Sequence, residues 1–396
     1  MISLIAPKGA LRRTEPGRTP HVTPMELFFD LVYVLTIIQL SHYLLAHLSV
    51  QGALEALVLF AGVWWTWNYT AWAANWVNPN HHAGRFLFVV LMACALLMAI
   101  AIPAAYADRG LLFALAYVSM ALIRAGYMAL LFRSEVMGRN YAQLFCWSAL
   151  SGAFWLAGAL LPENRLMLWA VAVLVDYAAP YAGFWVPGLG TTPMSSWTLK
   201  GLHLLERNQL IFIIALGESI LLLGGKMVYG DLSALSLGTA GVGFLIIVSL
   251  WFLYFHRTSD DGEQAFEGRS DHTELARAGL AYAHGIMVCG AIVCAVMIES
   301  ILAHPLDTVS TATAAIAAAG PVLFLLGSMI FRRSMGASAP MPYWLAIISI
   351  IGLCVLAQVT ALAGLWLGSG VLGMLIALAI VTSRSNAPST SQTGVG

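Results

Sequence analysis

Long apolar stretches recur along the chain, separated by short segments in which polar and charged residues gather. A helix that crosses a hydrocarbon core of about 30 Å needs roughly 20 mostly apolar residues. On this criterion the pattern predicts an all-α polytopic membrane protein of about twelve transmembrane helices. The predicted spans cover residues 25–48, 53–74, 85–104, 110–132, 141–161, 166–185, 203–224, 234–255, 278–301, 310–331, 342–360 and 366–383.

The last two spans are the hardest to separate, because residues 342–383 are almost continuously apolar. The segment GLWLGSG (364–370) is rich in glycine and offers a break between them. Without that break the count becomes eleven. Between two earlier spans, residues 256–277 form the largest loop, which is polar and has room for a short surface helix.

The positive charges of the loops indicate which side of the membrane each loop occupies. If the amino terminus is placed in the cytoplasm, fourteen Lys and Arg residues fall on the inner side. Arg109, Arg165 and Lys226 fall on the outer side. Because Lys and Arg favour cytoplasmic loops, this bias predicts that both termini are cytoplasmic.

Composition agrees with a membrane protein and excludes several other classes. Apolar residues make up 60% of the 396 positions and charged residues only 10%, whereas soluble domains carry about 25% charged residues. Basic and acidic residues balance at 19 each, so nothing indicates a nucleic-acid partner. The five cysteines are scattered, without zinc-ligand spacing. We therefore expect the lipid bilayer as the main partner, and no metal or other cofactor.

The chain divides into two similar halves around a central linker. We predict a cytoplasmic amino-terminal segment (1–22), a first six-helix half (23–185), a cytoplasmic linker (186–202), a second six-helix half (203–383) and a disordered cytoplasmic tail (384–396). The first helix of each half carries acids near its cytoplasmic end. Laying LFFDLVYVLTIIQL over ERNQLIFIIALGES aligns their apolar runs, which suggests a parallel 6+6 repeat about an axis along the membrane normal.

Two acids open the first span. An ionisable group deep in a bilayer costs about 2.5–3.5 kcal/mol on insertion scales, so it usually faces a partner or a wet cavity. Glu26 and Asp30 are four residues apart and share one face of a helix. Their alternative role is a helix-start acid pair after Thr23 and Pro24, favoured by the helix dipole.

An arginine and an aspartate lie near the midplane of the first half. Arg124 and Asp176 occupy similar depths in their spans, which suggests a buried ion pair. Asp30 and Glu218 are rival partners for the arginine. A purely structural pair is the alternative to a functional one.

The first span of the second half is the most unusual. Glu206 and Arg207 are adjacent, so they point in different directions and need different partners. Glu218 lies roughly 18 Å deeper and follows Gly217, which we expect to permit close helix approach. A carboxyl group without a cationic neighbour can accept and release a proton, so Glu218 is the best single candidate for a functional group. Its alternative is a protonated acid bonded to a neighbouring helix.

Two asparagines lie in the tryptophan-rich end of the second span. Most aromatic residues there are expected to be interface anchors. Asn68 and Asn75 are harder to explain in this way, because side-chain amides in a span seek hydrogen bonds with neighbouring helices.

These landmarks resemble the bacterial low temperature requirement protein A family. The resemblance rests on TPMELFFDLVYVLTIIQLS, WWTWNYTAWAAN, VDYAAP and HLLERNQLIFIIALGESIL together with Arg124, and covers roughly residues 20–380. It implies a multi-helix protein of the bacterial inner membrane, named for a cold-growth phenotype, and no established substrate or reaction. The residues it singles out are Glu26, Asp30, Asn68, Asn75, Arg124, Asp176, Glu206, Arg207 and Glu218.

The leading functional hypothesis is a secondary transporter of a small solute or ion, with proton coupling through Glu218 or Asp30 and an anionic group held by Arg124. A membrane scaffold or a sensor of cold or envelope stress is one alternative. The other is a lipid-modifying enzyme that uses carboxylates with His203 or His284. An enzyme is less favoured, because the chain has neither a nucleophile motif nor metal-ligand spacing.

Overall fold

The computed structural model describes residues 6–12, 21–197, 199–230, 232–267, 273–337 and 341–384. Only parts of the predicted amino-terminal segment 1–22 fall within these ranges. Of the predicted tail 384–396, residue 384 closes the last helix and residues 385–396 lie outside the described residues.

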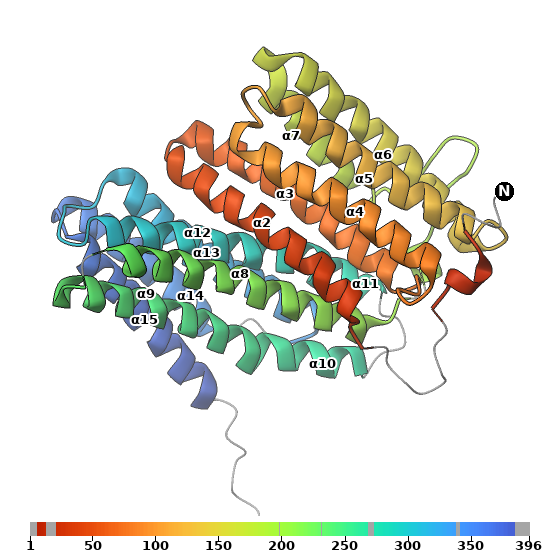
Figure 1. Cartoon of the computed structure of the whole chain (residues 1–396). Coiled ribbons are helices and arrows are strands. Elements are labelled where there is room, and N and C mark those ends of the chain that lie inside the picture. The colour runs from red at the N-terminus through yellow and green to blue at the C-terminus, as the bar shows by residue number, and fades with distance from the viewer. Residues whose placement is uncertain are drawn as a thin grey trace, which may run out of the picture.

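Within the described residues the chain is helical throughout (Figure 1). Twelve long helices coincide with the twelve predicted spans, which confirms the all-helical fold. They are α2 (Pro24–Ala46), α3 (Val50–Ala74), α4 (His82–Ala101), α5 (Gly110–Leu131), α6 (Val136–Leu160), α7 (Arg165–Ala178), α8 (Gly201–Tyr229), α9 (Ala234–Leu253), α12 (His284–Ala303), α13 (Thr311–Ser334), α14 (Met341–Val359) and α15 (Gly364–Arg384). The short helical segments are η1 (Lys8–Ala10), η2 (Ile102–Ala104), η3 (Pro162–Asn164), η4 (Met194–Ser196), η5 (Tyr254–Thr258), α10 (Ser259–Glu267), α11 (Thr273–Leu275) and η6 (Ala276–Ala283).

Ten of the twelve helices are long and apolar enough to cross a membrane, counted over the described ranges. The exceptions are α3 and α7. Helix α7 has 14 residues and ends at Ala178, so the span predicted to reach residue 185 is too long. It stops there because Pro180 has no N–H to continue the helical hydrogen bonds, and Gly183 and Phe184, with φ values of 58° and 49°, then turn the chain away.

Helix α3 has 25 residues, a sufficient length, but it is too polar to be recognised by hydropathy. Every residue from Gly62 to Ala74 is buried. The half of α3 from Gly62 to Ala74 is therefore enclosed by protein on all sides, and its polar side chains do not meet lipid.

The break between the last two helices lies earlier than predicted. Helix α14 ends at Val359 and α15 begins at Gly364, so the GLWLGSG segment belongs to α15. The connection turns through Ala361, whose φ is 53°, and Ala363 forms an isolated antiparallel bridge with Thr308. The predicted count of helices is right, whereas the position of the break is wrong.

The helices form two groups that pack side by side (Figure 1). In the first group α2 packs on α3 and α4, and contacts then follow the chain from α4 through α5 and α6 to α7. In the second group α8 packs on α9 and α12, and contacts follow the chain from α12 through α13 and α14 to α15. Helix α7 returns to α3, as α15 returns to α9. The groups meet mainly where α2 contacts α8 and α12.

The outer faces of the helices carry large exposed apolar side chains. Phe86 on α4, Leu174 on α7 and Ile348 on α14 are 72%, 67% and 64% exposed. Contiguous apolar surface of this kind is covered by lipid in a membrane protein. Together with the ten long apolar helices, it supports a chain embedded in the bilayer.

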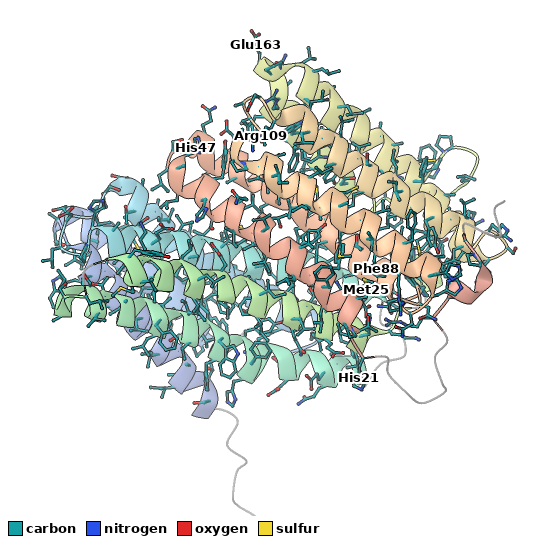
Figure 2. All side chains as sticks on the ribbon, in the orientation of Figure 1. His21, Met25, His47, Phe88, Arg109 and Glu163 are labelled. Atoms are coloured by element: carbon teal, nitrogen blue, oxygen red, sulfur yellow. The ribbon has the colours of Figure 1, made fainter. Side chains whose placement is uncertain are left out.

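The connections alternate between the two ends of the bundle. Figure 2 shows His21 and Met25 at one end, and His47, Arg109 and Glu163 at the other. We call the end that holds His21 the amino-terminal end. The predicted outer loops with Arg109 and Glu163 thus lie together, opposite the start of α2.

The predicted loop at 256–277 is largely helical where it is described. The π-helical turn Tyr254–Thr258 carries α9 into α10, which confirms a short helix in this segment. A second π-helical segment, Ala276–Ala283, leads into α12. The indole of Trp64 on α3 donates a hydrogen bond of 2.6 Å to the carbonyl of Ala281 in that segment.

The linker between the halves is ordered against α6. The amide of Gln143 donates to the carbonyl of Gly190 at 2.7 Å, and the Thr192 hydroxyl donates to Asn140 Oδ1 at 3.0 Å. Trp197, 2% exposed, packs against Tyr141 with ring centroids 5.2 Å apart. These contacts hold the start of α8 close to the end of α3 and the start of α6.

Candidate functional site

Helices α2 and α8 run parallel and contact each other at a constant sequence offset. Asp30 bonds to Arg207 and Ser41 bonds to Glu218, and both pairs are separated by 177 positions. Because the contacts advance together along both helices, the helices point in the same direction. The two pairs lie eleven residues apart, or about 16 Å along the interface.

Glu26 caps the start of α2 and belongs to the charge network at the same time. Its Oε2 atom accepts the N–H (2.8 Å) and the hydroxyl (2.7 Å) of Thr23, the N-cap residue. The same oxygen accepts a bond of 2.9 Å from Arg12 Nη2. Its other oxygen, Oε1, lies 3.0 Å from His203 Nε2 and 3.7 Å from Arg207 Nη1. Both roles considered from the sequence are therefore combined in one side chain.

Asp30 and Arg207 form a bidentate pair with no exposed surface. Arg207 Nε donates to Asp30 Oδ2 at 3.0 Å, and Arg207 Nη2 donates to Oδ1. The indole of Trp67 on α3 also donates to Oδ1, at 2.8 Å. Two parallel charge-assisted bonds fix the orientation of both groups, so this pair sets the register of α2 on α8.

Hydrogen bonds around His203 fix which ring nitrogen carries the proton. Asn75 Oδ1 accepts the N–H of Lys200 at 2.8 Å, so its Nδ2 atom is the donor that faces His203 Nδ1 at 3.2 Å. Nδ1 therefore accepts, and in the neutral ring Nε2 carries the hydrogen and faces Glu26 Oε1 at 3.0 Å. The 3.0 Å approach of Arg12 Nη1 to that nitrogen is then a contact between two donors.

The network is balanced in charge and buried. It holds two carboxylates, Glu26 and Asp30, and two guanidinium groups, Arg12 and Arg207, around the neutral His203. The side chains of all but Arg12 are 0% exposed, and that of Arg12 is 8% exposed. Removing one charge from such a network leaves another buried without a partner, which costs more than the intact pair contributes.

Arg12 is a site residue that sequence reasoning did not single out. It lies before the first span, in a segment without helical periodicity. Main-chain bonds of 2.7 Å from Arg12 N to Trp76 O and from Asn78 N to Ala10 O dock this segment on the α3–α4 connection. The docked segment places Arg12 against Glu26, at the amino-terminal end of the bundle.

Glu206 lies outside the network, at the surface. Its side chain is 38% exposed, and its Oε2 atom accepts the N–H of Val22 at 3.2 Å. The expectation that Glu206 and Arg207 find different partners is confirmed. Glu206 therefore holds the chain before α2 and does not contact the buried charges.

Glu218 occupies the other end of the α2–α8 interface. It is 1% exposed and accepts a bond of 2.8 Å from the Ser41 hydroxyl. No cation lies within 4 Å of it among the described residues. The expected close approach at Gly217 is wrong, because a Cβ built there meets no atom within 4 Å.

A cavity of about 410 Å³ opens at the end of the bundle beyond Glu218. Its lining includes Leu45 on α2 and Lys226 on α8, one to two helical turns further along than Ser41 and Glu218. Lys226 Nζ lies 3.4 Å from Glu299 Oε1. The side chain of Glu299 is 11% exposed, less than expected for a solvated acid near the end of a span.

A further buried acid near this end was missed. Glu55 is 7% exposed and accepts bonds from the Tyr43 hydroxyl at 2.6 Å and from Gln51 Nε2 at 2.9 Å. The position of Glu55 near the start of the predicted span 53–74 is the sequence feature that could have identified it as a buried acid. The tyrosine that shields it comes from another helix and could not be assigned by spacing.

The expected ion pair between Arg124 and Asp176 is not formed in the described structure. Asp176 Oδ2 accepts bonds from the hydroxyls of Tyr117 (2.5 Å) and Ser151 (2.7 Å). Arg124 donates instead to the neighbouring helix α3. The rival partners also have other contacts, since Asp30 bonds to Arg207 and Glu218 to Ser41.

The two asparagines have different surroundings. Asn75 joins the network through His203 and Lys200, as described above. Asn68 is 2% exposed, and its Oδ1 atom has no hydrogen-bond partner among the described residues. The structure thus brings Glu26, Asp30, Arg207 and Asn75 together with His203, while Asn68, Arg124, Asp176, Glu206 and Glu218 lie outside this network.

His284, a candidate in the enzyme hypothesis, is bonded on both sides. Its Nδ1 atom lies 3.0 Å from the carbonyl of Gly279, and its Nε2 atom lies 2.7 Å from the Tyr254 hydroxyl. The histidine thus bridges the two π-helical segments. Over the described ranges, no group of three His, Cys, Asp or Glu side chains is arranged to hold a metal ion.

The fold and the buried network define a multi-pass helical membrane protein. The chain belongs to the family described as "Bacterial low temperature requirement A protein (LtrA)", which it matches over residues 21–382. It is also 36% identical over 345 residues to "Uncharacterized protein RA0937" of Rhizobium meliloti (strain 1021), a match that covers 84% of this chain and 81% of that protein. No solved structure matches the chain.

Proposed function

We propose that the chain is a secondary transporter of a small solute or ion, coupled to protons through Glu218. The observation that carries this proposal is the parallel α2–α8 interface, which joins the two groups of helices by a buried ion network at one end and by the Ser41–Glu218 bond at the other. Charges buried between helix groups commonly mark an ion or solute pathway.

The arrangement of contacts supports a 6+6 repeat. Helices α8, α9, α12, α13, α14 and α15 pack on one another in nearly the same order as α2, α3, α4, α5, α6 and α7. The observed α2–α8 offset of 177 lies two positions from the offset of 179 in the sequence alignment of these helices. Parallel first helices in contact are what a repeat about an axis along the membrane normal produces.

The interface has two polar ends separated by an apolar middle. Ile37 on α2 and Ile211 and Ala215 on α8 lie between the two pairs along these helices, and all three are buried. Rocking of one half against the other would break polar contacts at one end while those at the opposite end hold. In a transporter these contacts serve as alternate gates.

We further propose that the amino-terminal end faces the cytoplasm and that the membrane is the bacterial inner membrane. The support is the excess of Lys and Arg in the loops of that end. The carboxyl terminus then lies on the same side, because twelve membrane crossings return the chain to the side on which it starts.

The test is proton flux in proteoliposomes of the purified full-length protein. Trapped pyranine reports internal pH while gradients of sodium chloride, sodium acetate or potassium gluconate are imposed in turn. The proposal expects pH change above that of empty liposomes with at least one gradient, reduced by Glu218→Gln. Asp261→Asn removes a carboxylate from the Arg332 pair outside this interface and is the matched control. Flux equal to that of empty liposomes under every gradient would overturn the proposal.

A further inference from the structure

Among the described residues, five arginine side chains are at most 9% exposed, and three of them face a carboxylate. Arg12 is bonded to Glu26, Arg207 is paired with Asp30, and Arg332 Nε donates to Asp261 at 2.7 Å. In these three cases the positive charge is balanced inside the protein. The other two, Arg124 and Arg165, have to be explained without an ion pair.

Arg165 is satisfied by main-chain carbonyls. Its guanidinium donates four hydrogen bonds, to the carbonyls of Gly158, Ala159, Ala105 and Ala107, at 2.8–3.2 Å. These carbonyls lie at or beyond the ends of helices, where the helix dipole favours a cation. Arg165 is therefore a structural group that joins connections at the end of the bundle opposite His21.

Arg124 is not paired with a carboxylate in the described structure, and it is bonded to one main-chain carbonyl where Arg165 is bonded to four. It is 1% exposed, and its Nη1 atom donates to the carbonyl of Thr66 at 3.0 Å and to Thr70 Oγ1 at 3.1 Å. Its Nε atom has no hydrogen-bond partner among the described residues, and no carboxylate of that set lies within 4 Å. The Tyr69 ring lies over the guanidinium, with its centroid 5.3 Å from Cζ.

We propose that Arg124 is the centre of a buried binding site for a small monovalent anion. The one carbonyl and one hydroxyl group bonded to Arg124 balance its charge less well than the four carbonyls at helix ends balance that of Arg165. The edge of a guanidinium that includes Nε is one with which arginine binds a carboxylate through two parallel bonds. A single negative charge neutralises the site, whereas a divalent anion leaves a surplus.

Hydroxyl groups around Arg124 complete the site. Tyr33, Tyr69, Tyr117 and Tyr141 lie close enough to the Arg124 guanidinium to interact with it electrostatically. The hydroxyls of Tyr69 and Tyr141 have no hydrogen-bond partner among the described residues, so they can donate to an anion. Tyr117 is already bonded to Asp176 and separates that carboxylate from the arginine.

The position of Arg124 relates the site to the proposed transport. It lies seven residues before the end of α5, about 10 Å from that end, and contacts the enclosed half of α3. The same helix α3 contacts the α2–α8 network through Trp67. The role of the Arg124 site as a substrate site rests on the proposed transport function. The bound anion is then the transported solute.

Anion binding is tested by thermal unfolding of the purified full-length protein in detergent and sodium HEPES. Sodium chloride, sodium acetate, sodium benzoate and sodium sulfate are the probes, at matched ionic strength. We expect a saturable rise in Tm with at least one monovalent anion and none with sulfate. Arg124→Gln should weaken that response about tenfold or more, because a charged hydrogen-bond donor is lost. Arg165→Gln, the matched control, should lower the starting Tm and keep the response.

An equal response of Arg124→Gln and the wild type would overturn the site, as would the absence of saturable stabilisation of the wild type by all monovalent probes. Should Arg124→Gln fail to fold, Tyr69→Phe and Tyr141→Phe are expected to weaken binding severalfold, and unchanged binding in both contradicts the site. Proton flux without anion binding would overturn the site and leave transport standing. Anion binding without any flux would overturn transport and leave the site.

Discussion

Asp30 on α2 and Arg207 on α8 form a bidentate ion pair across the interface between the two groups of helices. The same offset of 177 positions joins Ser41 to Glu218 further along the two helices. One register therefore holds both polar ends of the interface. A substitution at either pair should therefore weaken the packing between the two groups of helices.

The Asp30–Arg207 pair predicts a non-additive effect of mutations on stability. Asp30→Leu and Arg207→Met should each lower the free energy of unfolding by about 3–5 kcal/mol, because each leaves an uncompensated buried charge. The double variant should recover much of that loss. Thermal unfolding in detergent measures all three. A double variant as unstable as the sum of the single variants would contradict a coupled pair.

Arg12 predicts a local effect at the start of α2. Arg12→Gln removes the charge-assisted bond to Glu26, so amide hydrogen exchange should increase over residues 21–30 while the other helices keep their protection. Arg85→Gln is the control, because Arg85 is exposed and its Nε bonds to the carbonyl of Pro79. Equal exchange over residues 21–30 in wild type and Arg12→Gln would show that the docked segment does not hold this end closed.

A substitution at Glu218 should abolish proton coupling without destabilising the fold. Gln at this position keeps a hydrogen-bond acceptor for Ser41 but cannot titrate, so Glu218→Gln should retain a Tm near that of the wild type and lose the pyranine signal in proteoliposomes. Ser41→Ala removes the hydrogen bond and keeps the carboxyl group, and its flux should persist. Full coupled flux in Glu218→Gln would remove the role assigned to this residue.

Two glycines on neighbouring elements predict opposite effects of the same substitution. A Cβ at Gly285 would lie 2.6 Å from the indole nitrogen of Trp64, which is bonded to Ala281. Gly285→Ala should therefore cost about 1–3 kcal/mol through overpacking. Gly217→Ala enters open space and should be neutral or stabilising, since Ala is the better helix former. Thermal unfolding of both variants side by side checks the difference, and equal Tm values would contradict the packing described.

Much of the fold could be predicted from the sequence, because the free energy of burying apolar helices in lipid dominates a chain of this composition. Helix α3 is an exception that hydropathy does not predict. Its polar half from Gly62 to Ala74 is enclosed by protein, which hydropathy averaged along a sequence cannot detect. Helix α7 shows a second limit, because the local effect of Pro180 outweighs the apolar residues that follow.

The site residues were predictable as costly groups, but their partners were not. The four-residue spacing of Glu26 and Asp30 is matched by that of His203 and Arg207, and each spacing places its pair on one helix face. Which face meets which depends on tertiary packing between segments almost 180 residues apart. Their similar depth in the membrane favoured an ion pair between Arg124 and Asp176, whereas Asp176 is bonded to Tyr117 instead. Arg12 was missed because main-chain bonds, rather than a helical pattern, hold it in place.

The proposed transport requires the α2–α8 interface to open at its two ends in alternation. Electron–electron distance measurements between spin labels follow this opening, with one pair at exposed positions Arg139 and Arg333 and a second pair at Arg109 and Tyr229 at the opposite end. On lowering the pH, or on adding an anion that binds, one distance should lengthen as the other shortens. Distances that stay unchanged at both ends under all these conditions would contradict it.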